Sequence, residues 1–308
     1  MAYARRSYRR TTTRRKKAGS SRRSYRRKAY TRKRTYSRRS RAPRMSVRSL
    51  LNKTSQKKRD TMMTWTNVRP DATPGNQDYT PGPARLNGDP GTWYTFIFCP
   101  TARGVEDRDG VVGSKAQTAM RTSTTVYAKG YRENINLSTI SGRGWTWRRI
   151  TFTMKGDSLN LGNNDPQTSD VFRETSNGYM RLLAYSSAAF RAQDVIFKGT
   201  QNVDWQDVMQ APIDTRRISL KSDRTYRISS GNADGVQRFI KRWYPMEKNI
   251  YYEDDETGDK MSSSPFAVEN GHGMGDYYIV DFFRSNPGST PTDVLRVDFN
   301  GTYFWHEK

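Results

Sequence analysis

The sequence predicts an all-β protein, a sandwich of two antiparallel sheets that carries an Arg-rich N-terminal arm. The first 44 residues hold twenty Lys and Arg and no acidic side chain. Beyond residue 60, short apolar or alternating segments are separated by loops rich in Gly, Pro, Asn and Asp, which is the pattern of a sandwich. The sequence has no repeat with a period of 20–50 residues, which argues against a propeller or a solenoid.

Positive charge is concentrated at one end of the chain. Residues 1–59 contain 25 of the 54 Lys and Arg and none of the 30 Asp and Glu, which leaves residues 60–308 with a net charge of −1. We therefore divide the chain into an arm, 1–59, and a folded body, 60–308. The arm has too few apolar side chains to offset the entropy of ordering its backbone, so we expect it to be largely disordered. The near-neutral body predicts no concentrated basic face.

The body reads as a succession of strands. Apolar or alternating residues predict strands at 93–98, 124–131, 135–139, 145–154, 180–186, 194–199, 216–220, 225–229, 276–283 and 294–299. The spacing in 236–244 fits either a helix or a strand, and we favour the strand because its neighbours are β-like and Pro245 follows directly. In 145–154 the apolar phase slips by one residue, which predicts a bulge near Arg148 and Arg149. Helical spacing of the apolar residues predicts one short helix at 205–210.

Residues suited to catalysis or metal binding are sparse. Cys99 is the single cysteine, so no internal disulfide is possible, and its place at the end of an apolar segment predicts a buried thiol. His272 and His306 lack a second metal ligand at a suitable spacing. The acidic stretch 253–259 could bind a divalent cation or form a solvated turn. We expect no enzyme activity, no cofactor and no catalytic or metal site, and the lack of an 18-residue apolar run predicts no membrane insertion.

The arm has the composition of a nucleic-acid-binding segment. Arg presents forked, permanently charged donors to phosphate oxygens, and interleaved Tyr rings can stack on unpaired bases. A solubilising or purely targeting tail is the alternative. The expected nucleic-acid-binding residues are Arg5, Arg6, Tyr8, Arg9, Arg10, Arg14, Arg15, Lys16, Lys17, Arg22, Arg23, Tyr25, Arg26, Arg27, Lys28, Tyr30, Arg32, Lys33, Arg34, Tyr36, Arg38, Arg39, Arg41 and Arg44.

Two compact basic clusters also suit nuclear import. Short runs rich in Lys and Arg are typical of nuclear localisation signals and of nucleic-acid-binding patches alike. Host nuclear import receptors are therefore expected partners. The residues concerned are Arg14, Arg15, Lys16, Lys17, Lys57, Lys58 and Arg59.

Several stretches resemble the capsid proteins of genomoviruses, small viruses with circular single-stranded DNA that are related to geminiviruses. The most specific stretch is GWTWRRITFTMKG at 144–156, and the likeness extends over most of the chain. Other similar stretches are TSQKKRDTM, STTVYAKGYRENINLSTISGRGWTWRRITFTMKGD, YYEDDETG and GDYYIVDFF.

The resemblance implies a viral jelly-roll subunit that self-assembles into a small icosahedral shell around circular single-stranded DNA. It further implies a T=1 shell of sixty copies, located in the virion and, during assembly, in the host nucleus. Sixty arms would supply about 1500 positive charges, enough to offset a similar number of phosphates.

Two alternatives differ from this interpretation in class. The first is a nucleic-acid-binding or chaperone protein with a basic tail that never assembles. The second is a metal-dependent nuclease that uses the carboxylates of 253–259. Sizing of the protein separates the first from a capsid, and the effect of changing Asp254 and Asp255 on nuclease activity tests the second.

Overall fold

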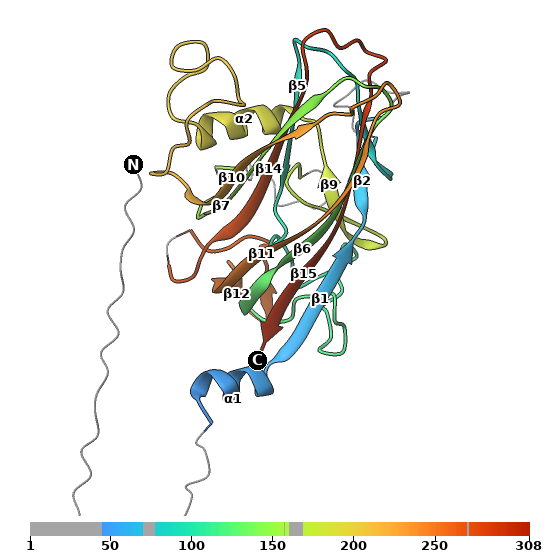
Figure 1. Ribbon diagram of the computed structural model, residues 1–308. Helices are drawn as coiled ribbons and strands as arrows, with labels where there is room; N and C mark the ends of the chain where they lie inside the picture. The colour runs from blue at the N-terminus through green and yellow to red at the C-terminus, as the bar shows by residue number, and fades with distance from the viewer. Residues whose placement is uncertain (1–44, 70–77, 157, 160–168, 270) are drawn as a thin grey trace, which may run out of the picture. The chain divides into compact units, whose positions relative to one another are not determined.

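The computed structural model describes residues 45–69, 78–156, 158–159, 169–269 and 271–308. A folded unit begins at Val47 and continues to Lys308. Its main feature is a pair of antiparallel sheets that face each other across a shared core (Figure 1). The disorder expected of residues 1–44 concerns a segment outside the described residues and stays a prediction.

Each of the two sheets has four long strands. The first has the order β1-β15-β6-β11, with the short β4 also paired to β15, and the second has the order β10-β7-β14-β5. The strands of the first sheet are β1 (Gln56–Met62), β15 (Leu295–Glu307), β6 (Thr125–Thr139), β11 (Gln237–Tyr251) and β4 (Ala84–Leu86). Those of the second are β10 (Ser219–Ile228), β7 (Trp145–Met154), β14 (Asp276–Ser285) and β5 (Trp93–Phe98).

The order of these strands defines the topology. When the eight long strands are numbered along the chain, the sheets read 1-8-3-6 and 5-4-7-2. This interleaving, in which each sheet takes strands from both halves of the chain, is that of a jelly roll. The predicted fold class, a jelly-roll sandwich of antiparallel sheets, is confirmed.

Smaller elements complete the unit. A third sheet has the order β3-β2-β9-β8, and β12 pairs with β13 as a separate hairpin. Their bounds are β2 (Thr64–Thr66), β3 (Thr80–Pro81), β8 (Arg173–Thr175), β9 (Gly178–Leu183), β12 (Asp255–Thr257) and β13 (Lys260–Ser262). The two helices are α1 (Val47–Thr54) and α2 (Ser187–Ile196).

Strands β7 and β14 of the second sheet are buried on both faces, which explains the slipped pattern in β7. Trp145 and Trp147 point into the core between the sheets. Ile150 and Phe152 point to the other face, where α2 and the chain after it form a second core. Pairing of β7 with β14 continues without a register shift, so the predicted bulge near Arg148 and Arg149 is wrong. Apolar residues can switch from one side of β7 to the other because each side packs against a hydrophobic core.

Residues 194–199, predicted as a strand, form the end of α2 and the turn after it. The hydroxyl of Ser186 accepts a hydrogen bond from the backbone N–H of Ala189, and this cap starts the helix. Ala189, Ala192 and Ile196 are buried at helical spacing. The sequence interpretation missed the cap and therefore read the final apolar residues as a strand.

Three further expectations differ from the structure. Residues 205–210 form turns instead of a helix, with the backbone N–H of both Gln210 and Ala211 bonded to the carbonyl oxygen of Asp207. Only residues 219–220 of the predicted strand 216–220 are in a strand, and they are joined to 225–228 in β10, whereas 216–218 belong to the turn before it. The segment 47–59, assigned to the arm, forms α1 and most of β1, because β1 finds a partner in the distant β15.

Four buried charges connect the three larger sheets. Arg149 of β7 and Arg181 of β9 each contact both Glu133 of β6 and Asp281 of β14. Arg149 Nε lies 2.6 Å from Asp281 Oδ1, and Arg181 Nε lies 2.8 Å from Glu133 Oε1. All four side chains are at most 4% exposed. The indole N–H of Trp147 donates a further hydrogen bond to Asp281.

The cluster favours the ionised forms of Glu133, Arg149 and Arg181. Burial by itself would raise the pKa of Glu133, but the guanidinium groups of Arg149 and Arg181 outweigh it and lower that pKa. Burial likewise opposes charge on Arg149, and the two carboxylates hold its pKa above the usual value. Each charge therefore depends on the others, because a buried ion without its partner is strongly unfavourable.

We expect Glu133→Gln to reduce the free energy of unfolding by about 3–5 kcal/mol, because it leaves buried guanidinium charge uncompensated. Chemical denaturation at neutral pH measures the loss. The matched control is Glu247→Gln, which removes the exposed carboxylate partner of Lys129 and should change stability little. Equal effects of the two substitutions would contradict the role of the buried cluster.

Candidate nucleic-acid interface

Of the arm, the structure describes residues 45–59 and not the Arg-rich residues 1–44. The nucleic-acid-binding residues predicted between Arg5 and Arg44, and the cluster at 14–17, lie outside the described residues. The chain enters the folded unit at α1, which exposes Arg48 and Lys53, and continues into β1. Positive charge thus extends from the arm into the first strand of the first sheet.

The predicted cluster at 57–59 is divided by the alternation of β1. Lys57 and Arg59 are exposed, whereas Lys58 is 2% exposed and points into the protein. Lys58 Nζ donates to the carbonyl oxygen of Met120 at 2.8 Å and lies 3.1 Å from Oε2 of Glu307. In the folded protein Lys58 is therefore a structural residue, and a receptor or a phosphate can reach only its two neighbours.

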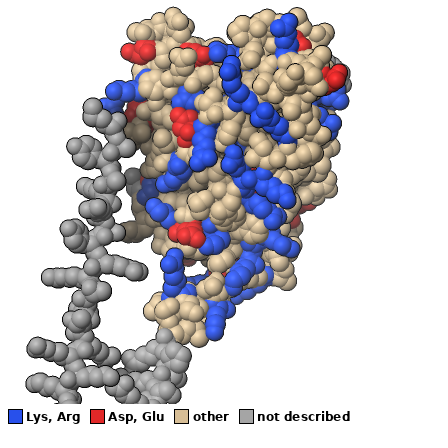
Figure 2. All heavy atoms as spheres, in the orientation of Figure 1, with Lys and Arg blue, Asp and Glu red and all other residues tan. Residues whose placement is uncertain are grey.

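The outward face of the first sheet is basic, contrary to the expectation from the net charge. Figure 2 shows Lys and Arg gathered on the side of the molecule where Figure 1 draws β11, β6, β15 and β1. Cations at the surface of this sheet are Lys57, Arg59, Lys129, Arg132, Lys241 and Arg296. These four strands hold five carboxylates. Glu133 and Glu307 are buried, Asp60 pairs with Arg103, Glu247 pairs with Lys129, and Asp298 accepts a hydrogen bond from the hydroxyl of Thr64.

One histidine lies within this face. His306 of β15 is paired in register with Lys57 on one side and with Tyr127 on the other, and the centroids of the His306 and Tyr127 rings are 5.7 Å apart. Burial lowers the pKa of His306, and the charges of Lys57 and Lys129 lower it further. The imidazole is therefore neutral at pH 7 and presents an uncharged ring.

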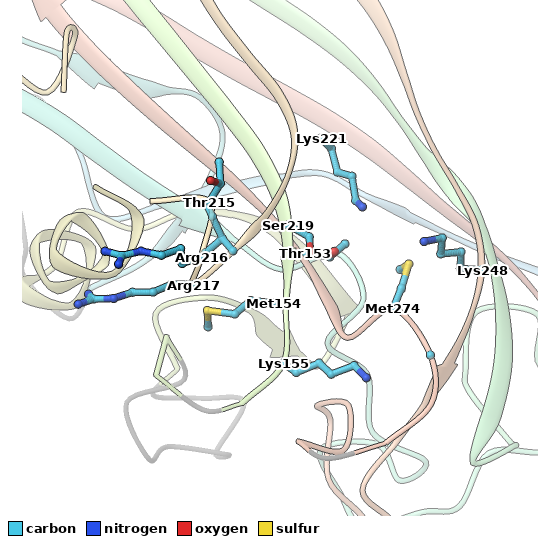
Figure 3. Close-up of a pocket in the computed structure, with 12 residues that line it drawn as sticks. Thr153, Met154, Lys155, Thr215, Arg216, Arg217, Ser219, Lys221, Lys248 and Met274 are labelled. Carbon is cyan, nitrogen blue, oxygen red and sulfur yellow. The ribbon is translucent and has the colours of Figure 1, made fainter. Parts of the chain in front are cut away.

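A second concentration of positive charge lies between the edges of the two sheets, at β10 and β11. A cavity of about 260 Å³ there is lined by five Lys and Arg and by no carboxylate. In Figure 3, Lys221 and Lys248 point toward each other, whereas Arg216 and Arg217 point away. Both arginines lie within 3.5 Å of the carboxylate of Asp214.

Two lysines of this cavity, Lys221 and Lys248, repel each other. Burial lowers the pKa of Lys221, and the charge of Lys248 lowers it further. Lys155, the third lysine of the lining, donates to the carbonyl oxygen of Gly271. An anion between Lys221 and Lys248 would relieve the repulsion, so the cavity suits a phosphate group of a nucleic-acid backbone.

Within the acidic stretch 253–259, Asp254 has a structural role. Both guanidinium nitrogens Nη1 and Nη2 of Arg121 donate to the carboxylate of Asp254, at 2.6 and 3.0 Å, and that guanidinium lies 3.9 Å from the ring centroid of Tyr252. Asp255 and Glu256 are exposed in the β12–β13 hairpin. Within the described part of the chain, no group of three or more His, Cys, Asp and Glu is arranged to hold a metal ion.

Two buried groups titrate far from their usual range and lie in the core. Burial raises the pKa of the Cys99 thiol, which is 1% exposed, so the predicted buried thiol is confirmed. Burial also raises the pKa of Asp276 to about 7. The Asp276 carboxyl, 1% exposed, accepts a hydrogen bond from the backbone N–H of Ala267 at 3.0 Å and a longer one from the hydroxyl of Thr101. Its contacts are those of a structural acid.

Comparisons with known proteins place few limits on function. No protein family and no curated protein matches the chain. One solved structure with similarity is VP1 of Trichodysplasia spinulosa-associated polyomavirus in complex with 3'-sialyllactose, at 7% identity and a TM-score of 0.14, covering 82% of this chain and 93% of that one. A score this low carries no weight, so the fold assignment rests on the strand order. Among the described helices, none has the length and apolarity to cross a membrane.

Neutralising the lysine cavity should weaken the salt dependence of single-stranded DNA binding. Each phosphate contact contributes about 0.7 to the slope of log K against log salt, so Lys221→Ala combined with Lys248→Ala should reduce the slope by about 1.4. Fluorescence anisotropy with a labelled oligonucleotide at several salt concentrations measures it. Lys198→Ala, an exposed lysine outside the cavity lining, is the control. An unchanged slope in the double variant would exclude phosphate contacts there.

Asp276→Asn should flatten the pH dependence of stability. A folded-state pKa of about 7, above the ordinary 3.8, means that the carboxyl stabilises the fold fully below pH about 4 and loses that contribution as the pH rises to about 7. Asn cannot ionise, so the variant should gain stability relative to the wild type across this window. Urea denaturation at several pH values measures the difference. Asp255→Asn, on the exposed hairpin, should follow the wild-type curve, and a parallel curve for Asp276→Asn would refute the assignment.

Proposed function

We propose that the protein is the structural capsid protein of a small virus with a circular single-stranded DNA genome. The observation that carries the proposal is a jelly-roll body joined directly to an arm in which 25 basic residues occur without an acid. Jelly rolls are frequent in viral capsids, and acid-free basic arms suit a packaged polyanion. The resemblance of 144–156 and other stretches to genomovirus capsid proteins supports the same conclusion.

In this function the body self-associates into the shell and the arm binds the genome. In a T=1 shell, sixty copies of residues 1–44, each with twenty basic side chains, would bring about 1200 positive charges to the DNA, which is comparable to the phosphates of a small genome. The binding is largely independent of sequence because it is made to phosphates. The protein acts as a structural component, and we assign it no catalytic activity and no cofactor.

Assembly on DNA in the host nucleus would require nuclear import before the protein enters the virion. Of the two predicted targeting clusters, Arg14, Arg15, Lys16 and Lys17 form the stronger candidate for an import receptor. The cluster at 57–59 is weakened as a linear signal because Lys58 is buried and paired with Glu307. We therefore assign the import signal to the cluster at 14–17.

The second candidate function is a nucleic-acid-binding protein that does not assemble. The basic outer face of the first sheet favours it as much as it favours a capsid, because either function needs a surface for a polyanion. The two differ in self-association. A capsid protein forms closed particles of uniform diameter, whereas the alternative coats the strand as monomers or small oligomers.

Full-length protein mixed with circular single-stranded DNA at moderate salt should give uniform closed shells in negative-stain microscopy, and the DNA inside should resist nuclease. Replacing the arm arginines 5–44 with Ala should abolish DNA protection with little effect on the stability of the body. Replacing them with Lys, which keeps the charge, should preserve it. Irregular aggregates with wild-type protein would favour the non-assembling function, and normal DNA content in the Ala variant would refute packaging by the arm.

A further inference from the structure

Aromatic rings accompany the cations on the outward face of the first sheet. On β11, Phe239 is 74% exposed and Trp243 is 46% exposed, which is unusual for side chains of this size. Phe304 of β15 is half-buried beside Trp243, and the centroids of the two rings lie 5.8 Å apart. The three residues belong to the two strands that flank β6, and strand alternation places them on one face.

A glycine makes room for the exposed indole. A Cβ atom at Gly130 of β6 would lie only 2.5 Å from Cζ2 of Trp243 and 2.7 Å from the carbonyl oxygen of Tyr244. The indole therefore occupies the space next to the β6 backbone that a side chain would fill. Gly130 also has a φ of +154°, which L residues rarely adopt. Trp243 is thus held over the sheet while much of its surface is open to solvent.

Cations lie between and beside these rings. The guanidinium of Arg132 lies 5.6 Å from the centroid of Phe304, and Arg132 is paired in register with Trp243. Arg59 of β1 is paired in register with Phe304. Lys241 precedes Trp243 by two residues and therefore shares its face. Charge and aromatic surface thus alternate across the sheet from β1 to β11.

We propose that this face binds single-stranded nucleic acid, with unpaired bases stacked on Trp243, Phe304 and Phe239. The inference rests on the proposed function and extends it by adding a binding surface on the folded body to that of the arm. Three strand spacings of about 4.8 Å make the face about 14 Å wide, which accommodates several bases stacked at about 3.4 Å.

The cations would bind the phosphates of the same nucleic-acid strand whose bases stack on the rings. Arg59, Arg132 and Lys241 lie beside the rings, so one nucleic-acid strand can contact both the cations and the aromatic side chains. A duplex hides the faces of its bases and offers only phosphates to these side chains. The face therefore discriminates single strands from duplexes, which the arm charges alone do not.

The test compares binding of a 20-nucleotide single strand and a duplex of equal length to the unassembled full-length protein at high salt. High salt weakens the phosphate contacts of the arm and leaves stacking as a larger share of affinity. Trp243→Ala should weaken single-strand binding about 5- to 100-fold, as the loss of one stacked base implies, and leave duplex binding unchanged. Phe190→Ala, which removes an aromatic side chain 41% exposed on α2, is the matched control.

Ultraviolet cross-linking of the wild-type protein to oligo(dT) gives a second readout that needs no variant, and peptides containing Trp243 or Phe304 should carry the cross-link. Equal losses for single strand and duplex, or no loss with Trp243→Ala, would overturn the proposal. A changed oligomeric state with unchanged oligonucleotide affinity would instead assign the face to another copy of the chain. If the wild type binds no nucleic acid, the proposed function itself fails.

Discussion

The fold depends on four charges buried where its sheets meet. Arg149, Arg181, Glu133 and Asp281 come from four strands in three sheets, and each contacts two members of opposite charge. Such a cluster contributes little net stability compared with an apolar core, but any arrangement of strands that separates its members leaves a buried charge without a partner. We infer that it specifies how the sheets are aligned. The apolar residues around it, which fit many alignments, supply most of the stabilising free energy.

Once the sheets are aligned, their outer faces differ in role. The second sheet is covered by α2 and the chain that follows, so both phases of β7 and β14 are buried. The first sheet buries one of its faces and exposes the other, as the alternating burial along β6 shows. Only such an open face can meet a ligand along its whole width. The arm joins the body at α1, directly before the first strand of this sheet, so both basic regions adjoin in the chain.

Net charge is a poor guide to this surface because it does not record where the charges lie. Several carboxylates of the body are buried in ion pairs with buried cations, including those of Glu133, Asp254, Asp281 and Glu307. Other cations, Lys129, Arg132, Lys241 and Arg296, remain at the surface of the first sheet. A sum over residues 60–308 cannot show that these cations share one face. The alternation in 236–244 is the sequence pattern that indicates part of this basic, aromatic face, because it places Phe239, Lys241 and Trp243 on one side of a strand.

The sequence alone determined the acid-free basic arm, the sandwich class, most strands and the buried thiol of Cys99, because composition and two-residue periodicity are local properties. Only the tertiary structure decided the features that depend on residues far apart in the chain. Pairing with β15 made 56–59 a strand and buried Lys58 against Glu307. A second core covered the outer phase of β7 and removed the need for a bulge. The basic, aromatic face exists only because β1, β15, β6 and β11, far apart in the chain, become neighbours, and no local pattern encodes that order.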